Sequence, residues 1–487
     1  MISDFLLLQG ADDDVFLVDG DRQHTYRELR ESAGRLVAEL MATGVEPGAH
    51  IGLLATNSLF WVAGYLAAMK LGVVVPLSDK TAPDELAAQV EWVGCAAVLA
   101  DRLHARRFGG AFEGLPVITE QALAGDGEPI WPTRSVQEGD DAALMFTSGT
   151  TARPKAVRLT HGNLEANTRS IVSYLDLQRS DRMLVILPFH YVFGASLLHT
   201  HLAVGGSLVL CHSFTYPETA VDLIDRQACT GLAGVPSSFQ LLLKASSYGS
   251  RPLPTLRLVQ QAGGRLAPDL IARLVEAQPA SSVFVMYGQT EATARLSYLP
   301  PELLGTKLGS IGRGIPGVEL AVVDADDVPV GEGQQGEIIA RGANISPGYY
   351  RDDEASAQKF RGGWLRTGDL ATVDGEGFIH IVGRSGDFIK SWGYRISPQQ
   401  VEEAALQHEL VTGAVAVGLP DDEAGEAVHL AVTAVPGAQL EASEVLDFLR
   451  RQLPKHMVPA GVHVLPQLPQ TASGKVSRGA VRGLLQG

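Results

Sequence analysis

The chain has 487 residues, of which 45% are hydrophobic and 19% charged, with a formal net charge of −16. This length predicts more than one structural unit, and the apolar content excludes a disordered chain. Because binders of nucleic acid or anionic membranes need clustered Lys and Arg, the acidic balance predicts no nucleic-acid and no membrane partner.

The N-terminus and the apolar runs favour a cytoplasmic protein. The first residues lack a basic stretch and turn acidic at 12–14, so we expect no signal peptide. The longest apolar run, 59–69, stops at Lys70 and is too short to span a bilayer. The three cysteines are far apart and show no metal or redox spacing, which predicts buried free thiols at Cys95, Cys211 and Cys229.

The first three hundred or so residues predict alternating strands and helices. Apolar residues recur at helical spacing between Thr25 and Gly44. A strand at 50–56, a helix at 59–72 and a buried strand at 73–78 follow, and the alternation continues to about 288. This pattern is typical of parallel sheets with helices packed on their faces.

In the remaining residues the pattern of expected strands and helices changes twice. Short strands at 318–324 and 336–342 and a turn at 374–377 predict a small barrel-like subdomain over about 310–382. Helices at 398–408 and 443–453 and strands at 413–420 and 427–435 predict a small α+β domain. We therefore expect an α/β fold with a large N-terminal domain of mixed or parallel sheets, 1–384, and a small mobile C-terminal domain, 385–487.

The segment from Thr147 to Lys155, TSGTTARPK, follows a predicted strand and predicts a phosphate-binding loop. Hydroxyls and free backbone N–H groups cradle phosphate oxygens, and Lys155 adds a positive charge. A generic Ser/Thr/Gly cluster is more often a polar surface turn, but the order of these residues is specific. The chain contains no Walker loop.

This loop resembles that of the adenylate-forming superfamily, which includes acyl-CoA synthetases, peptide-synthetase adenylation domains and firefly luciferase. The chain departs from the family pattern at Ala152 and Ala156, where the family has glycines. Further motifs follow in the family's order and spacing: 262–264 (AGG), 287–291 (YGQTE), 365–370 (LRTGDL), 383–396 and 469–478. The resemblance covers the chain from Tyr26 to Arg478.

The resemblance implies a role for each motif. Tyr287 would stack on adenine, Asp369 would accept from the ribose hydroxyls and Glu291 would hold Mg²⁺, which prefers oxygen ligands. Lys475 would serve adenylation and Lys390 the thioester step, with a hinge near Ser385-Gly386. The implied catalytic residues are Thr147, Lys155, Lys390 and Lys475, and the implied nucleotide-binding residues are Ser148, Gly149, Thr150, Thr151, Gly264, Tyr287, Gly288, Thr290, Asp369, Arg384 and Arg395.

The segment 187–194 resembles the family's aromatic gate between the acyl pocket and the thiol tunnel. His190 or Tyr191 would be that gate, although a structural role for His190 is an equal alternative. The implied pocket lining is Phe193, Ser196, Val235, Pro236, Ser237 and Gly264, and it indicates a largely hydrophobic acid. No Asp follows the gate to bind an α-amine, which disfavours amino acids. His199 and His201, spaced i and i+2 on a predicted helix, do not face each other, so we expect no metal site there.

The function implied by the resemblance is an acyl-CoA ligase that uses ATP, Mg²⁺ and coenzyme A. The carboxylate attacks the α-phosphorus of ATP to give acyl-AMP and pyrophosphate, and the thiol of CoA then displaces AMP, with rotation of the C-terminal domain between the steps. Ala152 and Ala156 motivate an alternative, a thioester-forming enzyme that receives acyl-AMP from an adenylating partner enzyme. A separate carrier protein as thiol acceptor, and a luciferase-like oxygenase or non-catalytic acyl-AMP binder, are lower alternatives.

Overall fold

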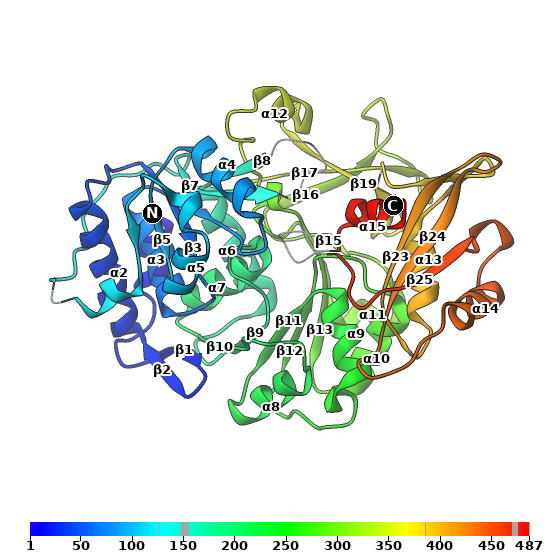
Figure 1. The fold of residues 1–487 in the computed structure, drawn as a ribbon, viewed down its shortest axis with the longest axis horizontal. Coiled ribbons are helices and arrows are strands. Elements are labelled where there is room, and N and C mark those ends of the chain that lie inside the picture. Colours follow the sequence, from blue (N-terminus) through cyan, green and yellow to red (C-terminus); the bar gives the residue numbers. More distant parts are fainter. Residues whose placement is uncertain (126, 148–154, 385, 470–475, 487) are drawn as a thin grey trace.

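Two sheets dominated by parallel strands build the first two-thirds of the chain in the computed structural model, which describes residues 1–125, 127–147, 155–384, 386–469 and 476–486. The N-terminal sheet has the order β6-β5-β3-β4-β7-β8, and the central sheet has the order β15-β14-β13-β12-β11-β9-β10-β1-β2. Figure 1 shows the first in blue to cyan and most of the second in green. The strands are β1 (Val15–Asp19), β2 (Arg22–Thr25), β3 (His50–Leu54), β4 (Val73–Pro76), β5 (Cys95–Ala100), β6 (Val117–Ile118), β7 (Asp141–Thr147), β8 (Lys155–Thr160), β9 (Arg182–Val185), β10 (Ser207–Leu210), β11 (Gly231–Gly234), β12 (Leu258–Gln261), β13 (Ser282–Tyr287), β14 (Ser297–Leu299) and β15 (Arg313–Gly314).

Helices between and outside the two sheets complete a layered architecture. One large core joins both sheets to the helices between them: α1 (Ile2–Leu7), α2 (Tyr26–Ala42), α3 (Leu59–Leu71), α6 (His161–Leu175) and α7 (Val192–Val204). Two further cores cover the outer faces through α4 (Pro83–Val93) and α5 (Arg102–Arg107) on the N-terminal sheet, and α8 (Glu218–Arg226), α9 (Pro236–Ala245) and α10 (Pro268–Ala277) on the central sheet. Burial on both faces explains why the parallel strands read as continuous apolar runs.

Local sequence signals set the ends of the predicted helices. The Thr25 hydroxyl accepts from the backbone N–H of Glu28, and the Glu28 carboxylate accepts from that of Thr25, so a capping box starts α2. The predicted helix at 59–72 is α3, which begins after the Ser58 cap and is buried almost all round. The predicted strand–helix alternation is confirmed.

An antiparallel barrel-like sheet follows the layered part and lies above the central sheet in Figure 1. Its order is β16-β17-β19-β18, with β20 paired to β19. Its elements, with the helices near it, are α11 (Leu304–Lys307), β16 (Val318–Val323), β17 (Gln335–Gly342), α12 (Asp353–Lys359), β18 (Phe360–Arg361), β19 (Trp364–Val373) and β20 (Ile379–Arg384).

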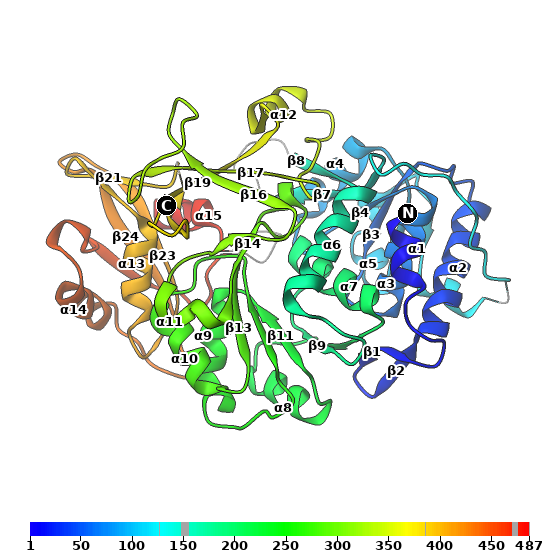
Figure 2. The ribbon, with the colours of Figure 1, turned by 180° about the vertical axis from the view of Figure 1, so that it is seen from behind.

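The C-terminal residues form a separate α+β unit, orange to red in Figures 1 and 2. It comprises β21 (Ile389–Ser391), β22 (Tyr394–Ile396), α13 (Pro398–Leu406), β23 (Val411–Asp421), β24 (Gly425–Ala434), α14 (Ala442–Gln452), β25 (Gly461–Val464) and α15 (Arg478–Gln486). Lys244 of α9 docks this unit: its Nζ donates to the backbone carbonyls of Leu406 and His408 at 3.0 and 2.9 Å. A second contact is the ion pair of Arg265 with Glu403 at 3.0 Å.

Cys95, Cys211 and Cys229 are free and buried, as predicted. Among the described residues, no helix has the length and apolar character needed to cross a membrane.

Candidate active site

The predicted phosphate loop lies in a hairpin between β7 and β8. Thr147 at the end of β7 pairs with Lys155 at the start of β8, and the Thr147 hydroxyl lies 3.4 Å from the Lys155 carbonyl oxygen. The residues between them, 148–154, include Ser148, Gly149, Thr150 and Thr151 and lie outside the described residues. The antiparallel pairing brings the two ends of the loop together.

Tyr287, Asp369 and Arg384 form a hydrogen-bonded cluster. The Tyr287 hydroxyl donates to one Asp369 oxygen at 2.6 Å, and Arg384 Nε donates to the other at 2.9 Å. Asp369 is 6% exposed, and its backbone N–H donates to the Thr367 hydroxyl. Burial, followed by the Asp369 charge, raises the pKa of Tyr287, so the phenol stays protonated and remains the donor.

Strand pairing explains this cluster. Tyr287 is the last residue of β13, while Asp369 and Arg384 face each other across the β19–β20 ladder. Gly288 follows Tyr287 at a point where a Cβ would lie 1.8 Å from the Ala294 carbonyl oxygen. Only glycine therefore allows the chain to turn here without moving the backbone of Ala294.

Glu291 lies one short turn further along, in the 3₁₀ segment η4 (Thr290–Ala292). Its carboxylate accepts a hydrogen bond from the Tyr349 hydroxyl at 2.7 Å, and Lys155 Nζ lies 5.1 Å from the centre of the Tyr349 ring. Tyr349 therefore links the metal candidate to the cation that ends the phosphate loop. Burial and the Glu291 charge raise the pKa of Tyr349, which keeps it a donor.

The Glu291 carboxylate suits Mg²⁺ better than it suits a metal ion whose ligands all come from the protein. Its environment supplies one hard oxygen ligand with a fixed orientation, and Mg²⁺ completes its shell with water and substrate phosphates. Among the described residues, no group of three or more His, Cys, Asp or Glu side chains is arranged to hold a metal ion. The residues fit a magnesium ion delivered with a nucleotide.

Glycines 263 and 264 form a close-packed wall after β12. A Cβ at Gly264 would lie 3.2 Å from Pro236 Cγ, and one at Gly263 would lie 2.9 Å from Val235 Cγ1 and 4.0 Å from Phe193 Cδ1. Gly263 also has φ of +85°, a conformation that side chains disfavour. Phe193, Val235 and Pro236 of the predicted pocket therefore meet at this wall.

The predicted gate lies at the start of α7. His190 and Tyr191 are half-buried, with ring centroids 5.9 Å apart at an interplanar angle of 79°. Phe193, in the first turn of α7, is 6% exposed. Ser237 lies at the start of α9 and is exposed.

The predicted C-terminal site residues lie in the smaller domain. Lys390 is exposed on β21, and its backbone N–H donates to the Glu426 carboxylate at 2.8 Å. Arg395 is exposed on β22, stacks over Phe388 at 5.2 Å and lines a hollow of about 260 Å³ with Gln335 and Val382. Lys475 lies outside the described residues.

The two histidines of α7 have different partners. His199 Nε2 lies 3.0 Å from the Tyr65 hydroxyl, and His201 Nδ1 lies 2.9 Å from the Leu197 carbonyl oxygen. Burial lowers the pKa of both, to about 3 for His199. Each is a neutral core histidine, and the two side chains have separate hydrogen-bond partners.

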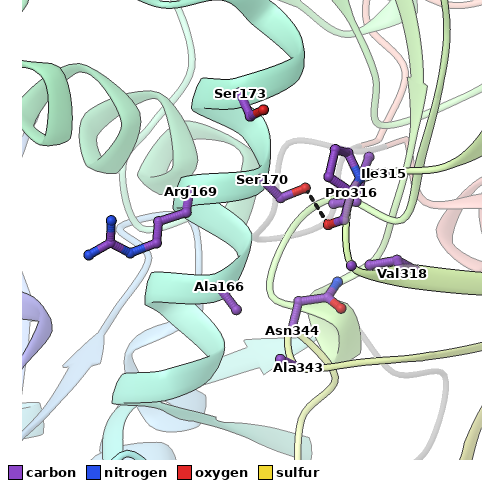
Figure 3. A pocket seen from close by; sticks show the side chains of 10 residues that line it. Ala166, Arg169, Ser170, Ser173, Ile315, Pro316, Val318, Ala343 and Asn344 are labelled. Atoms are coloured by element: carbon purple, nitrogen blue, oxygen red, sulfur yellow. Dashed lines mark hydrogen bonds between the residues drawn. The ribbon is translucent and has the colours of Figure 1, made fainter.

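A separate hollow of about 290 Å³ lies between α6 and the turn before β16 (Figure 3). The Ser170 hydroxyl donates to the Pro316 carbonyl oxygen across it at 2.8 Å. Its lining contains none of the site residues predicted from the sequence, so it belongs to the junction between α6 and the barrel-like sheet.

Comparison with known proteins shows the family. The family model described as "AMP-binding enzyme" matches residues 8–350, and the one described as "AMP-binding enzyme C-terminal domain" matches residues 400–475. The chain belongs to the AMP-binding enzyme family. Its relatives place it with the acyl-CoA synthetases of the adenylate-forming superfamily, and its α/β fold is the one expected.

Similar AMP-binding enzymes cover nearly the whole chain. A feruloyl-CoA synthase of Amycolatopsis sp. is 32% identical over 94% of this chain and 93% of its own length. The o-succinylbenzoate CoA synthetase of Bacillus subtilis, solved with its acyl-adenylate intermediate, has a TM-score of 0.88 and 28% identity over 100% of this chain and 97% of that one. The same synthetase solved with ATP and magnesium ion has a TM-score of 0.86 and 28% identity, covering 100% of this chain and 99% of that one.

Sequence reasoning missed several polar residues around this site. No motif in the sequence marks Tyr349 or Lys359. In the structure Lys359 Nζ donates to the Thr367 carbonyl oxygen at 3.0 Å, and burial lowers its pKa. Arg295 and Gln260 are almost fully buried, and Arg295 stacks on Phe193 of the predicted pocket. No spacing signal marked them, because burial depends on distant segments.

Proposed function

We propose that this protein is an acyl-CoA ligase that forms acyl-AMP from ATP and a carboxylic acid and then transfers the acyl group to coenzyme A. The observation that carries the proposal is the Tyr287–Asp369–Arg384 cluster beside Glu291 and Lys155. Each Asp369 oxygen accepts one protein hydrogen bond and keeps a lone pair for a ribose hydroxyl. Relatives named as CoA ligases support CoA as the acceptor.

The chemical task is to bring two anions together. Lys155 and a magnesium ion on Glu291 would offset the repulsion between the carboxylate and the triphosphate, and fixed donors would stabilise the charge that develops on pyrophosphate. Tyr349 would keep the Glu291 carboxylate in one orientation. Lys475 would add a further cation at the α-phosphate, and rotation of residues 385–487 about the hinge would then present Lys390 for the thioester step.

Ala156 gives no reason to doubt the adenylation step. It lies in β8 opposite Phe146, does not have positive φ, and its methyl group is fully buried in the core beneath the N-terminal sheet. A strand residue of this kind needs no glycine. The thioester-only alternative therefore rests on Ala152, which lies outside the described residues.

Isotope exchange between pyrophosphate and ATP tests the proposal. With ferulate or o-succinylbenzoate as the acid, we expect acid-dependent exchange, and with CoA added we expect the acyl-CoA product. Thioester formed from supplied acyl-AMP without exchange would select the alternative that depends on an adenylating partner. Neither activity with any acid tested would select a non-catalytic acyl-AMP binder.

Two glycine variants separate the contributions of the alanines. If Ala152 weakens adenylation, A152G raises the exchange rate while A156G does not, since Ala156 occupies an unstrained strand position. Equal gains from both variants would contradict our interpretation of Ala156. Transfer to a purified carrier protein that exceeds transfer to CoA would replace CoA as the acceptor.

A further inference from the structure

Arg295 is a buried cation on the acyl side of the central sheet. It follows η4 and precedes β14, and it is 2% exposed. Its guanidinium stacks on the Phe193 ring, with Cζ 4.0 Å from the ring centre, and Nε donates to Met286 Sδ at 3.4 Å. Arg295 thus contacts the pocket wall at which Phe193 and Gly263 meet.

No acidic side chain among the described residues neutralises this guanidinium. Among the described residues, Arg295 forms no ion pair, and its Nη2 is buried without a hydrogen-bond partner. Burial lowers the pKa of Arg295, and the neighbouring Tyr174 phenol, which is uncharged, offsets this only in part. Because an unpaired buried cation is costly, the retention of Arg295 here favours a role in binding an anion.

Gln260 adds a second unpartnered group on the same face of the sheet. It lies in β12 opposite Phe284 of β13 and is 1% exposed, and neither amide atom has a partner among the described residues. Side chains alternate along strands, so Gln260 shares its face with Phe284 and Met286, the residue that Arg295 contacts. Its neighbour Gln261 is equally buried but donates to the Gly264 carbonyl oxygen at 2.7 Å.

We infer that the acyl pocket ends at Arg295 and Gln260 and that the acid substrate carries a second anionic carboxylate at its far end. This inference rests on the proposed function and narrows its substrate class from hydrophobic acids to dicarboxylic acids with an apolar middle. Phe193 and the glycine wall contact the apolar part. The guanidinium compensates the second carboxylate, and the Gln260 amide donates one more hydrogen bond to it. A neutral acceptor would leave the buried charge uncompensated.

Matched acids test this inference. The pairs differ by one carboxyl group: adipate and hexanoate, suberate and octanoate, terephthalate and benzoate, o-succinylbenzoate and benzoylpropionate. We expect the unaltered enzyme to prefer the diacid in at least one pair, and we expect R295M to reduce the diacid-to-monoacid ratio of kcat/KM by roughly 10- to 100-fold, the loss typical of a charged hydrogen bond. R295K should keep part of the preference. No preference in any pair, or an unchanged ratio in R295M, overturns the inference.

A stability measurement separates recognition from a structural role. Since R295M and Q260L remove buried side chains with unpartnered polar atoms, we expect each to lower the Tm of the ligand-free protein less than Q261L does, because Q261L frees the Gly264 carbonyl. A lowered Tm in R295M and Q260L equal to that in Q261L would assign them a structural role and overturn the inference. The preferred diacid should raise the Tm of the unaltered protein but not of R295M. This binding readout does not need adenylation, so it fails independently of the proposed function.

Discussion

Asp369 and Glu291, which we place at the nucleotide, differ from Arg295 and Gln260, which we place at the acid, in how their polar atoms are satisfied. On the nucleotide side Asp369 is bonded by Tyr287 and Arg384, and Glu291 by Tyr349. On the acyl side Arg295 and Gln260 retain unpartnered atoms. The difference teaches that the protein itself holds the groups needed for every turnover, while the groups that recognise a particular acid are left for the acid to satisfy.

Removing the Asp369 carboxylate, which Tyr287 and Arg384 hydrogen-bond, should have the largest effect on activity. D369A removes the ribose acceptor and leaves the Tyr287 hydroxyl and Arg384 without their charged partner. Since two hydrogen bonds to a charge are lost, we expect a loss of roughly a hundredfold or more in kcat/KM for ATP, measured by pyrophosphate exchange. D422A, an exposed aspartate in the β23–β24 turn, is the control. Near-normal exchange in D369A would contradict the nucleotide site.

A smaller change on the same side is Y349F, which removes one hydroxyl. Glu291 would lose the donor that orients it, so we expect the Mg²⁺ concentration needed for half-maximal exchange to rise and the rate to fall by about tenfold, in keeping with one hydrogen bond to a charged group. Y350F alters the next tyrosine, whose ring packs against His50 and Trp92. If both variants show the same Mg²⁺ dependence, Tyr349 does not position Glu291.

Lys244 of the N-terminal domain forms hydrogen bonds with the C-terminal domain. Lys390 is exposed in the observed docking, and we propose that this docking serves adenylation rather than thioester formation. K244M removes the bonds to Leu406 and His408, and we expect adenylation to fall by roughly two- to tenfold relative to thioester formation. Hydrogen exchange at the end of α13 should increase. The control is K455M, which changes an exposed lysine of the C-terminal domain. It should change neither the adenylation rate nor hydrogen exchange at the end of α13. An equal loss in both half-reactions would count against a docking role.

The last prediction concerns stability rather than activity, and its variable is pH. Burial lowers the pKa of His161 to about 4 and of His199 to about 3, from an ordinary value of 6.5. The unfolded chain therefore binds more protons below pH 6.5 than the folded one, so the free energy of unfolding should fall as pH drops from 6.5 toward 4. His199 lies in α7, beside the acyl side. Denaturant titrations of H199Q should show a shallower fall over this window, and an unchanged slope would exclude His199 as a source.

Much of the fold was predictable because its signals are local. The capping box at Thr25 and Glu28, the buried run of α3 and the uninterrupted apolar strand β4 each identify an element without reference to the rest of the chain. The residues that we expect to bind the nucleotide share a local signal of the same kind: Tyr287, Gly288 and Glu291 lie within one short motif whose backbone geometry requires its own glycine.

What the sequence determined by itself was the set of elements, their α/β alternation and the family motifs, because each depends on neighbours a few residues apart. Only the tertiary structure decided how the strands divide into two sheets, with β1 and β2 joining the central sheet beside β10 rather than the strands that follow them. It also decided that Ala156 is a strand residue, that Tyr349 contacts Glu291 and that Arg295 is buried without a counter-ion. These properties arise from contacts between segments far apart in the chain, and burial, which sets the cost of a charge, exists only once those segments have packed.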